Sequence, residues 1–273
     1  MYEFHSDKDR YFNIQYQTAK EYILPFLQEH VPGKKFSRVL EIGCGEAGVL
    51  KCFLEEGAFC TGIELSPSRT AAAEQYHAQA LEEGRIEFVN RNVYDIDPEN
   101  DLGGRYDLVI MKDVIEHIPD QREFMHHLQA FLNPEGLVFF AFPPWQMPFG
   151  GHQQIARNKL LSRLPYYHLL PMSVYKMILR LFGESKLTVD ELEEIKETGI
   201  SIERFERFLK SAKFKIIAMR HYLVNPIYSY KFNLKPREQN AVIQRIPWVR
   251  DFLTTGCYYL VTAAPKSPKG DFL

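Results

Sequence analysis

The sequence has few cysteines, almost no net charge and no long apolar run, and each shortage narrows what the protein can be. Its four cysteines, Cys44, Cys52, Cys60 and Cys257, form no C-x-x-C pair. We therefore expect reduced, mostly buried thiols in a cytoplasmic protein. The formal net charge is only −2. Proteins that bind nucleic acid usually carry a strongly basic surface, so we expect no nucleic-acid partner.

Long hydrophobic segments are also missing. Residues 1–10 are polar and charged, which is unlike a secretory signal, and apolar runs such as 137–145 are far too short to span a bilayer. The composition nevertheless suits a folded core, because 45% of the 273 residues are hydrophobic and 14% are aromatic. The length fits one large α/β domain with insertions, or two small domains, and this composition excludes global disorder.

Short apolar strands alternate with helices from Arg38 onward. The predicted strands are 38–43, 59–65, 85–90, 106–111 and 137–142. Such alternation predicts an α/β fold with a parallel, doubly wound sheet. Ligands of these sheets bind beyond the carboxyl ends of the strands, where the strand order reverses. The loop after the first strand should therefore lie at the functional site.

Other segments flank or interrupt this core. We expect an N-terminal helical segment over 1–35, a core over 36–145 and 200–264, a helical insertion with three helices over 146–199, a second, irregular insertion over 222–256, and a frayed tail over 265–273. Two more strands, 215–221 and 257–263, border the second insertion. The core rhythm resumes after each interruption. We expect the first insertion, 146–199, to serve as a lid.

Residues 39–48, Val-Leu-Glu-Ile-Gly-Cys-Gly-Glu-Ala-Gly, carry the most functional information. The apolar run leads into Gly43, Gly45 and Gly48 and then into a new amphipathic run. This predicts a strand, a tight glycine turn and a helix start, which allow a backbone to approach a nucleotide-like ligand closely. Glu64 ends the next strand, 21 residues after Gly43. A carboxylate there can accept both ribose hydroxyls of NAD or of S-adenosylmethionine, so neither cofactor is excluded by these residues.

Glu41 and the segment 106–118 favour one cofactor over the other. The chain resembles the class I S-adenosylmethionine-dependent methyltransferases, and most closely their branch of quinone-biosynthesis and other small-molecule enzymes. The matching pieces, in order, are Glu41-Ile42-Gly43-Cys44-Gly45, Glu64, Tyr106-Asp107-Leu108-Val109, Val114-Ile115-Glu116-His117-Ile118 and Asn133-Pro134-Glu135-Gly136-Leu137. The resemblance covers 36–145 and 200–264. It implies a Rossmann-like, mostly parallel seven-stranded sheet with an antiparallel last strand.

The resemblance also implies a role for each residue of the cofactor site. Glu41 and the backbone of Gly43, Cys44 and Gly45 should approach the methionine part of S-adenosylmethionine, and Glu64 should hold the ribose. Leu65 and Val93 would enclose the adenine ring. Asn92 stands where the family often has aspartate, and its carbonyl can still accept from the adenine amine. The backbone at Met111 and Lys112 would lie under the sulfonium. We expect no metal ion at this site.

Methyl transfer to a hydroxyl or ammonium group also needs a base when the pKa of the acceptor is high. The candidates are Asp113, His117 and His152. His152 follows a stretch with three prolines and two glycines after the fifth strand, so the chain can turn back toward the ligand. We expect Trp145, Phe149 and His152 to form one wall of the acceptor pocket and Tyr166 or Tyr167 another.

The first insertion has a one-sided charge pattern. Residues 151–182 contain five basic residues and no acidic ones, interleaved with leucines and tyrosines. Such a stretch can lie on an anionic membrane or cover an acidic or lipid-like substrate, and we favour a substrate lid. The sequence thus predicts a methyltransferase acting on a small-molecule acceptor. Its rivals are a nicotinamide-dependent oxidoreductase and a non-catalytic protein that binds an S-adenosyl ligand.

Overall fold

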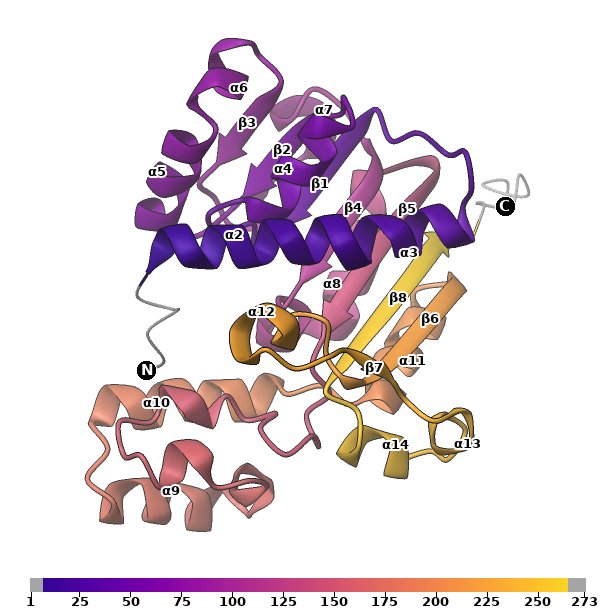
Figure 1. Cartoon of the computed structure of the whole chain (residues 1–273). Coiled ribbons are helices and arrows are strands. Elements are labelled where there is room, and N and C mark those ends of the chain that lie inside the picture. Colours follow the sequence, from indigo (N-terminus) through magenta and orange to yellow (C-terminus); the bar gives the residue numbers. More distant parts are fainter. Residues whose placement is uncertain (1–6, 265–273) are drawn as a thin grey trace, which may run out of the picture.

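A mixed eight-stranded sheet forms the centre of the molecule (Figure 1). The computed structural model describes residues 7–264. The strands are β1 (Arg38–Ile42), β2 (Phe59–Ile63), β3 (Ile86–Val89), β4 (Tyr106–Lys112), β5 (Leu132–Phe142), β6 (Phe214–Val224), β7 (Arg237–Glu238) and β8 (Gly256–Ala263). Their order is β3-β2-β1-β4-β5-β8-β6-β7, with β1 to β5 parallel and β8 antiparallel to both of its neighbours.

This topology confirms the predicted fold class, with one correction. The expected sheet had seven strands, whereas β7 adds an eighth strand of two residues inside the second insertion. It pairs with the edge of β6 through Tyr222 and Val224. Two residues are too few to show the alternation by which a strand is recognised in a sequence. The predicted tail over 265–273 lies outside the described residues.

Helices cover both faces of the sheet and the edges near the insertions. They are α2 (Lys8–Thr18), the π-helical turn η1 (Ala19–Ile23), α3 (Leu24–His30), α4 (Gly48–Glu55), α5 (Pro67–Tyr76), α6 (Ala78–Glu82), η2 (Val93–Asp95), α7 (Pro98–Asp101), η3 (Ile115–His117), α8 (Gln121–His127), η4 (Leu128–Phe131), η5 (Gln153–Ile155), η6 (Leu161–Arg163), η7 (Tyr167–Leu169), α9 (Met172–Leu181), α10 (Lys186–Thr198), α11 (Ile202–Ser211), α12 (Tyr228–Phe232), α13 (Ala241–Gln244) and α14 (Val249–Phe252). Among residues 7–264, none of them is long and apolar enough to cross a membrane.

The N-terminal helix runs along one face of the sheet (Figure 1). Residues 8–30 of the predicted N-terminal segment are helical, but the middle turn of this helix, η1, has π-helical hydrogen bonding. Pro25 follows directly, as the second residue of α3. Proline lacks an N–H and its ring crowds the carbonyl one turn earlier, so the wider π turn lets the helix continue through it.

The core consists of two hydrophobic clusters, one on each face of the sheet. Along β4, Leu108 and Ile110 belong to one cluster, and Val109 and Met111 to the other. Successive side chains of a strand point to opposite faces, and both faces of this parallel strand are covered by helices. This explains the continuous apolar run in the sequence.

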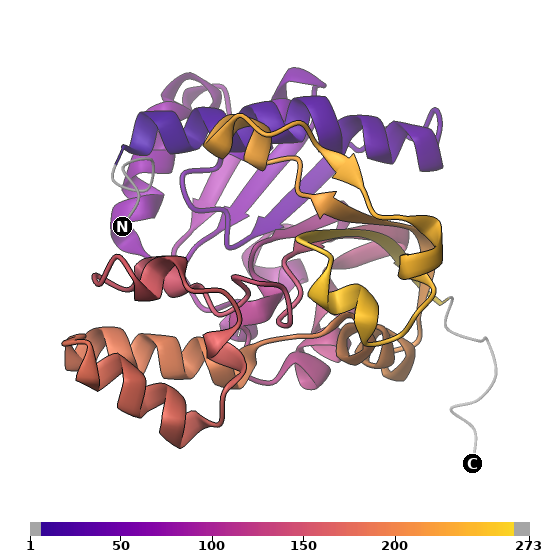
Figure 2. The same cartoon turned by 60° about the horizontal axis from the view of Figure 1, so that its bottom comes forward.

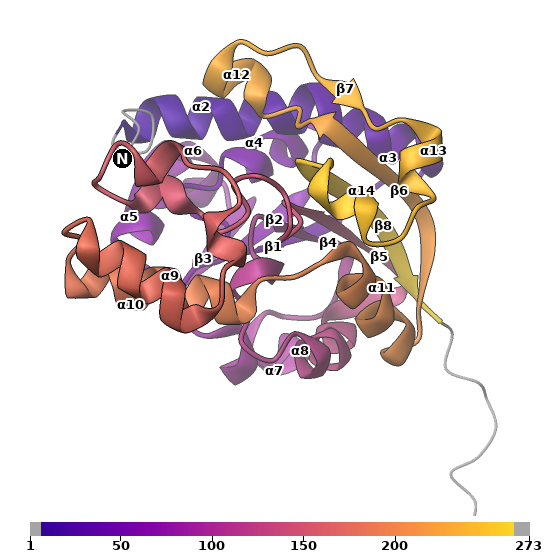
Figure 3. The same ribbon diagram turned by 90° about the horizontal axis from the view of Figure 1, so that it is seen from below.

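The first insertion forms a helical unit with a small core of its own. Helices α9 and α10 pack together and enclose Tyr175, Leu179 and Leu192, all of them fully buried. The remaining chain of the insertion makes short 3₁₀ turns, so two α-helices replace the three that were expected. Figures 1 and 3 place this unit beyond the carboxyl ends of the parallel strands, as a lid would be.

The strand order reverses between β1 and β4, because β2 and β3 lie on one side of β1 while β4 and β5 follow on the other. The loops after β1 and β4 therefore meet at the same edge. Figure 2, which looks toward this edge, shows the first and the second insertion on either side of it. The topology thus selects this edge as the candidate site.

Candidate active site

The glycine turn after β1 is held by backbone hydrogen bonds to β2. The amides of Gly43 and Cys44 both donate to the carbonyl of Ile63, at 2.8 and 3.1 Å. Gly43 and Gly45 have φ angles of +70° and +56°, a region that residues with a side chain rarely adopt. A Cβ atom at Gly45 would also lie 2.0 Å from Nη2 of Arg69. The turn therefore favours glycine by its conformation, and a side chain at Gly45 would also displace the Arg69 guanidinium.

Glu64 ties the end of β2 to this turn. One carboxylate oxygen accepts the amide N–H of Gly45 at 2.8 Å, and the other accepts the amide N–H of Ser66 at 2.9 Å. A carboxylate has about four acceptor positions, so each oxygen can accept a further hydrogen bond. Leu65, the next residue, is 67% exposed, which leaves its apolar side chain available to a flat ring.

The residues predicted after β3 and β4 occupy three different environments. Asn92 is exposed, and its carbonyl oxygen accepts the amide N–H of Tyr94 at 3.1 Å. Val93 is buried. The side chain of Met111 lies fully inside the core, so only its backbone can face a ligand.

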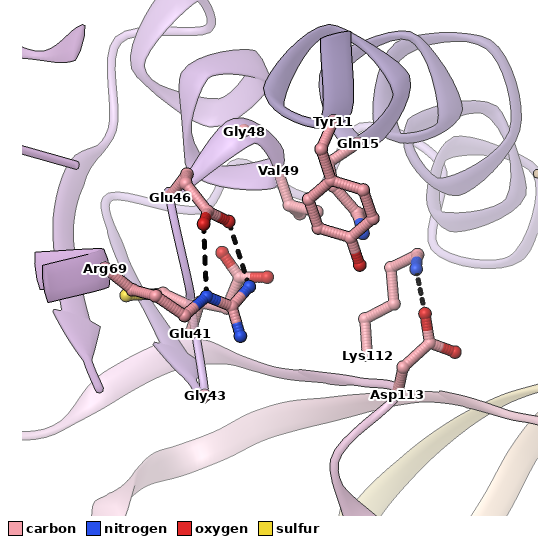
Figure 4. Close-up of a pocket in the computed structure, with 11 residues that line it drawn as sticks. Tyr11, Gln15, Glu41, Gly43, Glu46, Gly48, Val49, Arg69, Lys112 and Asp113 are labelled. Atoms are coloured by element: carbon pink, nitrogen blue, oxygen red, sulfur yellow. Dashed lines mark hydrogen bonds and ion pairs between the residues drawn. The ribbon is translucent and has the colours of Figure 1, made fainter. Parts of the chain in front are cut away.

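A pocket lies between the glycine turn, the end of β4 and the N-terminal helix (Figure 4). Its lining residues are Tyr11, Gln15, Glu41, Gly43, Cys44, Glu46, Gly48, Val49, Arg69, Lys112 and Asp113. Five predicted site residues are therefore brought together here: Glu41, Gly43, Cys44, Lys112 and Asp113. Gly45 and Glu64 adjoin them through the hydrogen bond just described.

The charged groups of the pocket shift one another's pKa values. Burial raises the pKa of Glu41 well above its usual range, although Lys112 and Arg69 oppose this shift. Lys112 and Asp113 form an ion pair (Figure 4). Burial lowers the pKa of Lys112, but Asp113 and Tyr11 outweigh burial and raise it. Burial raises the pKa of Asp113, but Lys112 and Lys231 hold it below its usual range. The pocket thus contains a buried carboxyl group, Glu41, whose ionisation is disfavoured, beside the Lys112–Asp113 ion pair.

Sequence reasoning missed five lining side chains, those of Tyr11, Gln15, Glu46, Val49 and Arg69. Tyr11 and Gln15 come from the N-terminal helix, more than 25 residues before the glycine turn. Glu46 and Arg69 form a two-point ion pair across the pocket, with N–O distances of 2.9 and 3.2 Å (Figure 4). Glu46 lies within the glycine turn of residues 39–48 but was given no role there, and Tyr11, Gln15 and Arg69 belong to no recognisable motif. Only the packing of α2 on α4 brings the first two to this edge.

Two histidines far apart in the sequence lie next to each other beside this pocket. The rings of His117 and His152 stack with their centroids 5.1 Å apart. Asp113 interacts electrostatically with His152, so all three predicted base candidates are neighbours. Burial lowers the pKa of His117. A neutral imidazole at neutral pH can accept a proton.

Glu116 joins the two histidines in a group that could hold a metal ion. Ligand atoms of Glu116, His117 and His152 all lie within 4.8 Å of one another. Both carboxylate oxygens of Glu116 are buried and accept no hydrogen bond from another of residues 7–264. Burial raises the pKa of Glu116 well above its usual range. The donor set of two imidazoles and a carboxylate suits a divalent cation, which sequence reasoning did not anticipate.

The aromatic residues expected in the acceptor pocket are more dispersed than predicted. Trp145 and Tyr167 pack into the core of the first insertion, where Trp145 meets the ring of His168 at a centroid distance of 4.7 Å. Tyr166 donates a hydrogen bond to the carbonyl of Phe252 at 3.3 Å, which joins the first insertion to the second. Aromatic side chains near a binding site often serve packing first. Of the residues predicted to form the acceptor pocket, His152 stacks on His117, which follows β4.

Comparison with known proteins gives a match over more than half of the chain. A family model described as a methyltransferase domain matches residues 12–169. The ubiquinone biosynthesis O-methyltransferase of Erwinia tasmaniensis is 29% identical over 140 residues, which are 49% of this chain and 56% of that protein. The enzyme of the same name from Vibrio campbellii is 29% identical over 143 residues, 52% of this chain and 59% of that protein. The chain thus spans about half the length of the curated relatives it matches.

Solved structures share the fold at low sequence identity. Magnesium protoporphyrin IX methyltransferase from Synechocystis PCC 6803 superposes with a TM-score of 0.52 and 16% identity, covering 92% of this chain and 84% of that one. Geranyl diphosphate C-methyltransferase from Streptomyces coelicolor A3(2) gives a TM-score of 0.54 and 11% identity, covering 89% and 78%. Both likenesses extend over nearly the whole chain, and they bear on the fold alone.

Proposed function

The chain belongs to the methyltransferase-domain family, as its motifs predicted, and we propose that it is an enzyme that transfers a methyl group from S-adenosylmethionine to a small-molecule acceptor. The observation that carries the proposal is the hydrogen bond between Glu64 and the amide of Gly45. This hydrogen bond holds the carboxylate of Glu64, which is proposed to bind the ribose, beside the glycine turn. The backbone of that turn can approach the ligand closely because its glycines carry no side chains. S-adenosylmethionine supplies an activated methyl group on a sulfonium.

The pocket residues fit this cofactor. One oxygen of Glu41 is buried without a hydrogen-bond partner among residues 7–264, and an ammonium group such as that of the methionine part would supply the missing donor. Glu64 would hold the ribose, and the exposed side chain of Leu65 would cover the adenine ring together with Val93. Asn92 would meet the adenine edge, and the backbone of Met111 and Lys112 would lie beneath the sulfonium.

The groups after β4 would handle the acceptor. His117 and His152 are stacked, and burial lowers the pKa of His117, so a neutral His117 can accept a proton from an acceptor hydroxyl; His152 would be the second candidate for this role. Asp113 would orient the pair through its charge. Residues 146–199 would close over the acceptor and exclude water, which favours reaction between aligned groups.

We propose that the acceptor is a small molecule. Further observations bear on the compartment of the protein and on the atom that is methylated. All four cysteines are buried and free, which supports a reducing, cytoplasmic environment. The basic stretch of the first insertion is explained by a substrate lid, which we favour over contact with a membrane surface. The curated relatives methylate within ubiquinone biosynthesis by name, which supports oxygen as one candidate site of methylation.

Two measurements test the proposal against its rivals. Calorimetry with S-adenosylhomocysteine and with NAD(H) distinguishes a methyltransferase site from a nicotinamide site, and we expect binding of the first alone. Incubation with S-adenosylmethionine and a panel of phenols, amines and carboxylic acids should then release S-adenosylhomocysteine in an acceptor-dependent manner. Tight cofactor binding with no release for any acceptor would favour a non-catalytic binding protein. Binding of NAD(H) instead would favour an oxidoreductase.

A further inference from the structure

The side chain of Arg69 reaches the glycine turn from the first turn of α5 (Figure 4). Its guanidinium lies against Gly45, because a Cβ atom there would be 2.0 Å from Nη2 and 2.6 Å from Cζ. Glu46, the residue after Gly45, accepts from Nε at 3.2 Å and from Nη2 at 2.9 Å. The absence of a side chain at Gly45 thus leaves the space in which Glu46 holds the guanidinium.

This ion pair occupies one edge of the guanidinium and leaves the other edge available. Arginine has five N–H donors in a planar fork, and a carboxylate accepts two of them side by side. The hydrogen bonds from this guanidinium to other residues of 7–264 come from Nε and Nη2, so Nη1 remains for a ligand. Burial lowers the pKa of Arg69, but Glu46 and Glu64 outweigh burial and raise it. The second edge is therefore a cationic donor at all pH values near neutrality.

Glu41 offers the opposite kind of group in the same pocket. Its carboxyl group is buried, and one of its oxygens has no hydrogen-bond partner among residues 7–264. Glu41 and Arg69 are close enough to interact electrostatically. The pocket thus presents an acceptor and a cationic donor near each other. An α-amino acid carries an ammonium and a carboxylate on one carbon, so a single amino-acid group can meet both.

We propose that Arg69 binds the carboxylate of the methionine part of S-adenosylmethionine, and that Glu46 is the positioning residue that holds its guanidinium in place. The ammonium of the same methionine part is the donor already proposed for Glu41. Arg69 then makes the site select adenosyl ligands that carry an intact amino acid. This inference rests on the proposed function and adds the residues that determine its cofactor specificity.

Lys112 also brings a positive charge to the pocket, and it is less suited to this role. Its ammonium forms an ion pair with Asp113, and its side chain is only 5% exposed, whereas the side chain of Arg69 is 41% exposed. A lysine ammonium acts as a point charge, while the guanidinium fork matches the two oxygens of a carboxylate. We therefore expect selection for the carboxylate to depend on Arg69.

The test compares two ligands that differ only in this carboxylate. S-adenosylhomocysteine carries it, whereas S-adenosyl-3-thiopropylamine has a hydrogen in its place and keeps the amine. Calorimetry at neutral pH measures both dissociation constants. Because hydrogen bonds between charged groups are strong, we expect the wild-type protein to bind S-adenosylhomocysteine about tenfold more tightly or better. Equal affinities would overturn the proposal, and binding of neither ligand would refute the proposed function on which it rests.

Variants identify the residues responsible. Arg69→Gln should abolish the preference for S-adenosylhomocysteine without weakening the binding of the amine, which also shows that this variant is folded. Glu46→Gln removes the charge that holds the guanidinium and should reduce the preference, while Arg122→Gln, at an exposed arginine of α8, is the matched control and should leave it unchanged. A preference that survives Arg69→Gln contradicts the assignment, as does an equal loss of affinity for both ligands. An unchanged preference in Glu46→Gln would contradict the positioning role.

Discussion

Replacing Glu64 with alanine should weaken cofactor binding far more than it destabilises the fold. The carboxylate is 8% exposed and accepts one backbone N–H on each oxygen, so its position is fixed before any ligand arrives. Two hydrogen bonds from ribose hydroxyls to a charged acceptor contribute about 1.5–3 kcal/mol each. Their loss, about 3–6 kcal/mol, corresponds to a loss of affinity of roughly 10²- to 10⁴-fold.

The same substitution also removes the acceptors of two backbone donors. An N–H left without a partner costs about 1–3 kcal/mol when it is fully buried. At this partly accessible edge, water can replace the carboxylate, so we expect a loss of about 2 kcal/mol in the free energy of unfolding. Glu64→Gln keeps one acceptor oxygen and should give intermediate values for both quantities.

Calorimetry with S-adenosylhomocysteine and urea unfolding measure the two effects separately. Glu74→Ala, at an exposed carboxylate on α5, is the matched control and should change neither quantity. A Glu64→Ala protein that remains folded and binds S-adenosylhomocysteine with wild-type affinity would refute the role given to this carboxylate. A loss of stability without a loss of affinity would assign Glu64 to the architecture of the turn alone.

Three further predictions concern catalysis, the lid and pH. If His152 acts as the base, His152→Ala should lower turnover by roughly 10²–10⁴-fold and leave cofactor affinity unchanged; if it only packs against His117, stability should fall while the rate is spared. Hydrogen exchange in 146–199 should slow when S-adenosylhomocysteine and an acceptor are added, and protection there equal to that of β1 and β4 without ligand would contradict a mobile lid. Burial and Glu203 raise the pKa of Asp251 to about 8, so its protonated form stabilises the fold at low pH and this contribution is lost as the pH rises from about 4 to 8. Asp251→Asn should therefore flatten the decline over that pH range in the free energy of unfolding measured with urea. An unchanged pH profile would show that Asp251 does not titrate in this range.

Much of the fold could be predicted because its signals are local. The strands of the parallel sheet were recognised from short apolar runs, and the glycine turn from three residues that have to adopt an unusual backbone or leave space. Their positions at the ends of predicted strands were enough to select Glu41, Lys112 and Asp113 as candidate site residues. These features depend on neighbours in the sequence, so a single chain is enough to reveal them.

The parts that were missed depend on packing between distant segments. Tyr11 and Gln15 reach the pocket because α2 packs on α4, and Arg69 reaches it from α5. Trp145 and Tyr167 were expected to face the acceptor, but the lid requires a core of its own and uses them there. The sequence shows that these side chains are large and aromatic, and it does not show which of two nearby apolar environments receives them.

The most direct test of the central claim is a crystal structure of the complex with S-adenosylhomocysteine. The account predicts ribose hydroxyls within hydrogen-bond distance of Glu64, the adenine ring between Leu65 and Val93, and the sulfur beside the backbone of Met111 and Lys112. A ligand bound elsewhere, or a ribose that makes no contact with Glu64, would contradict it.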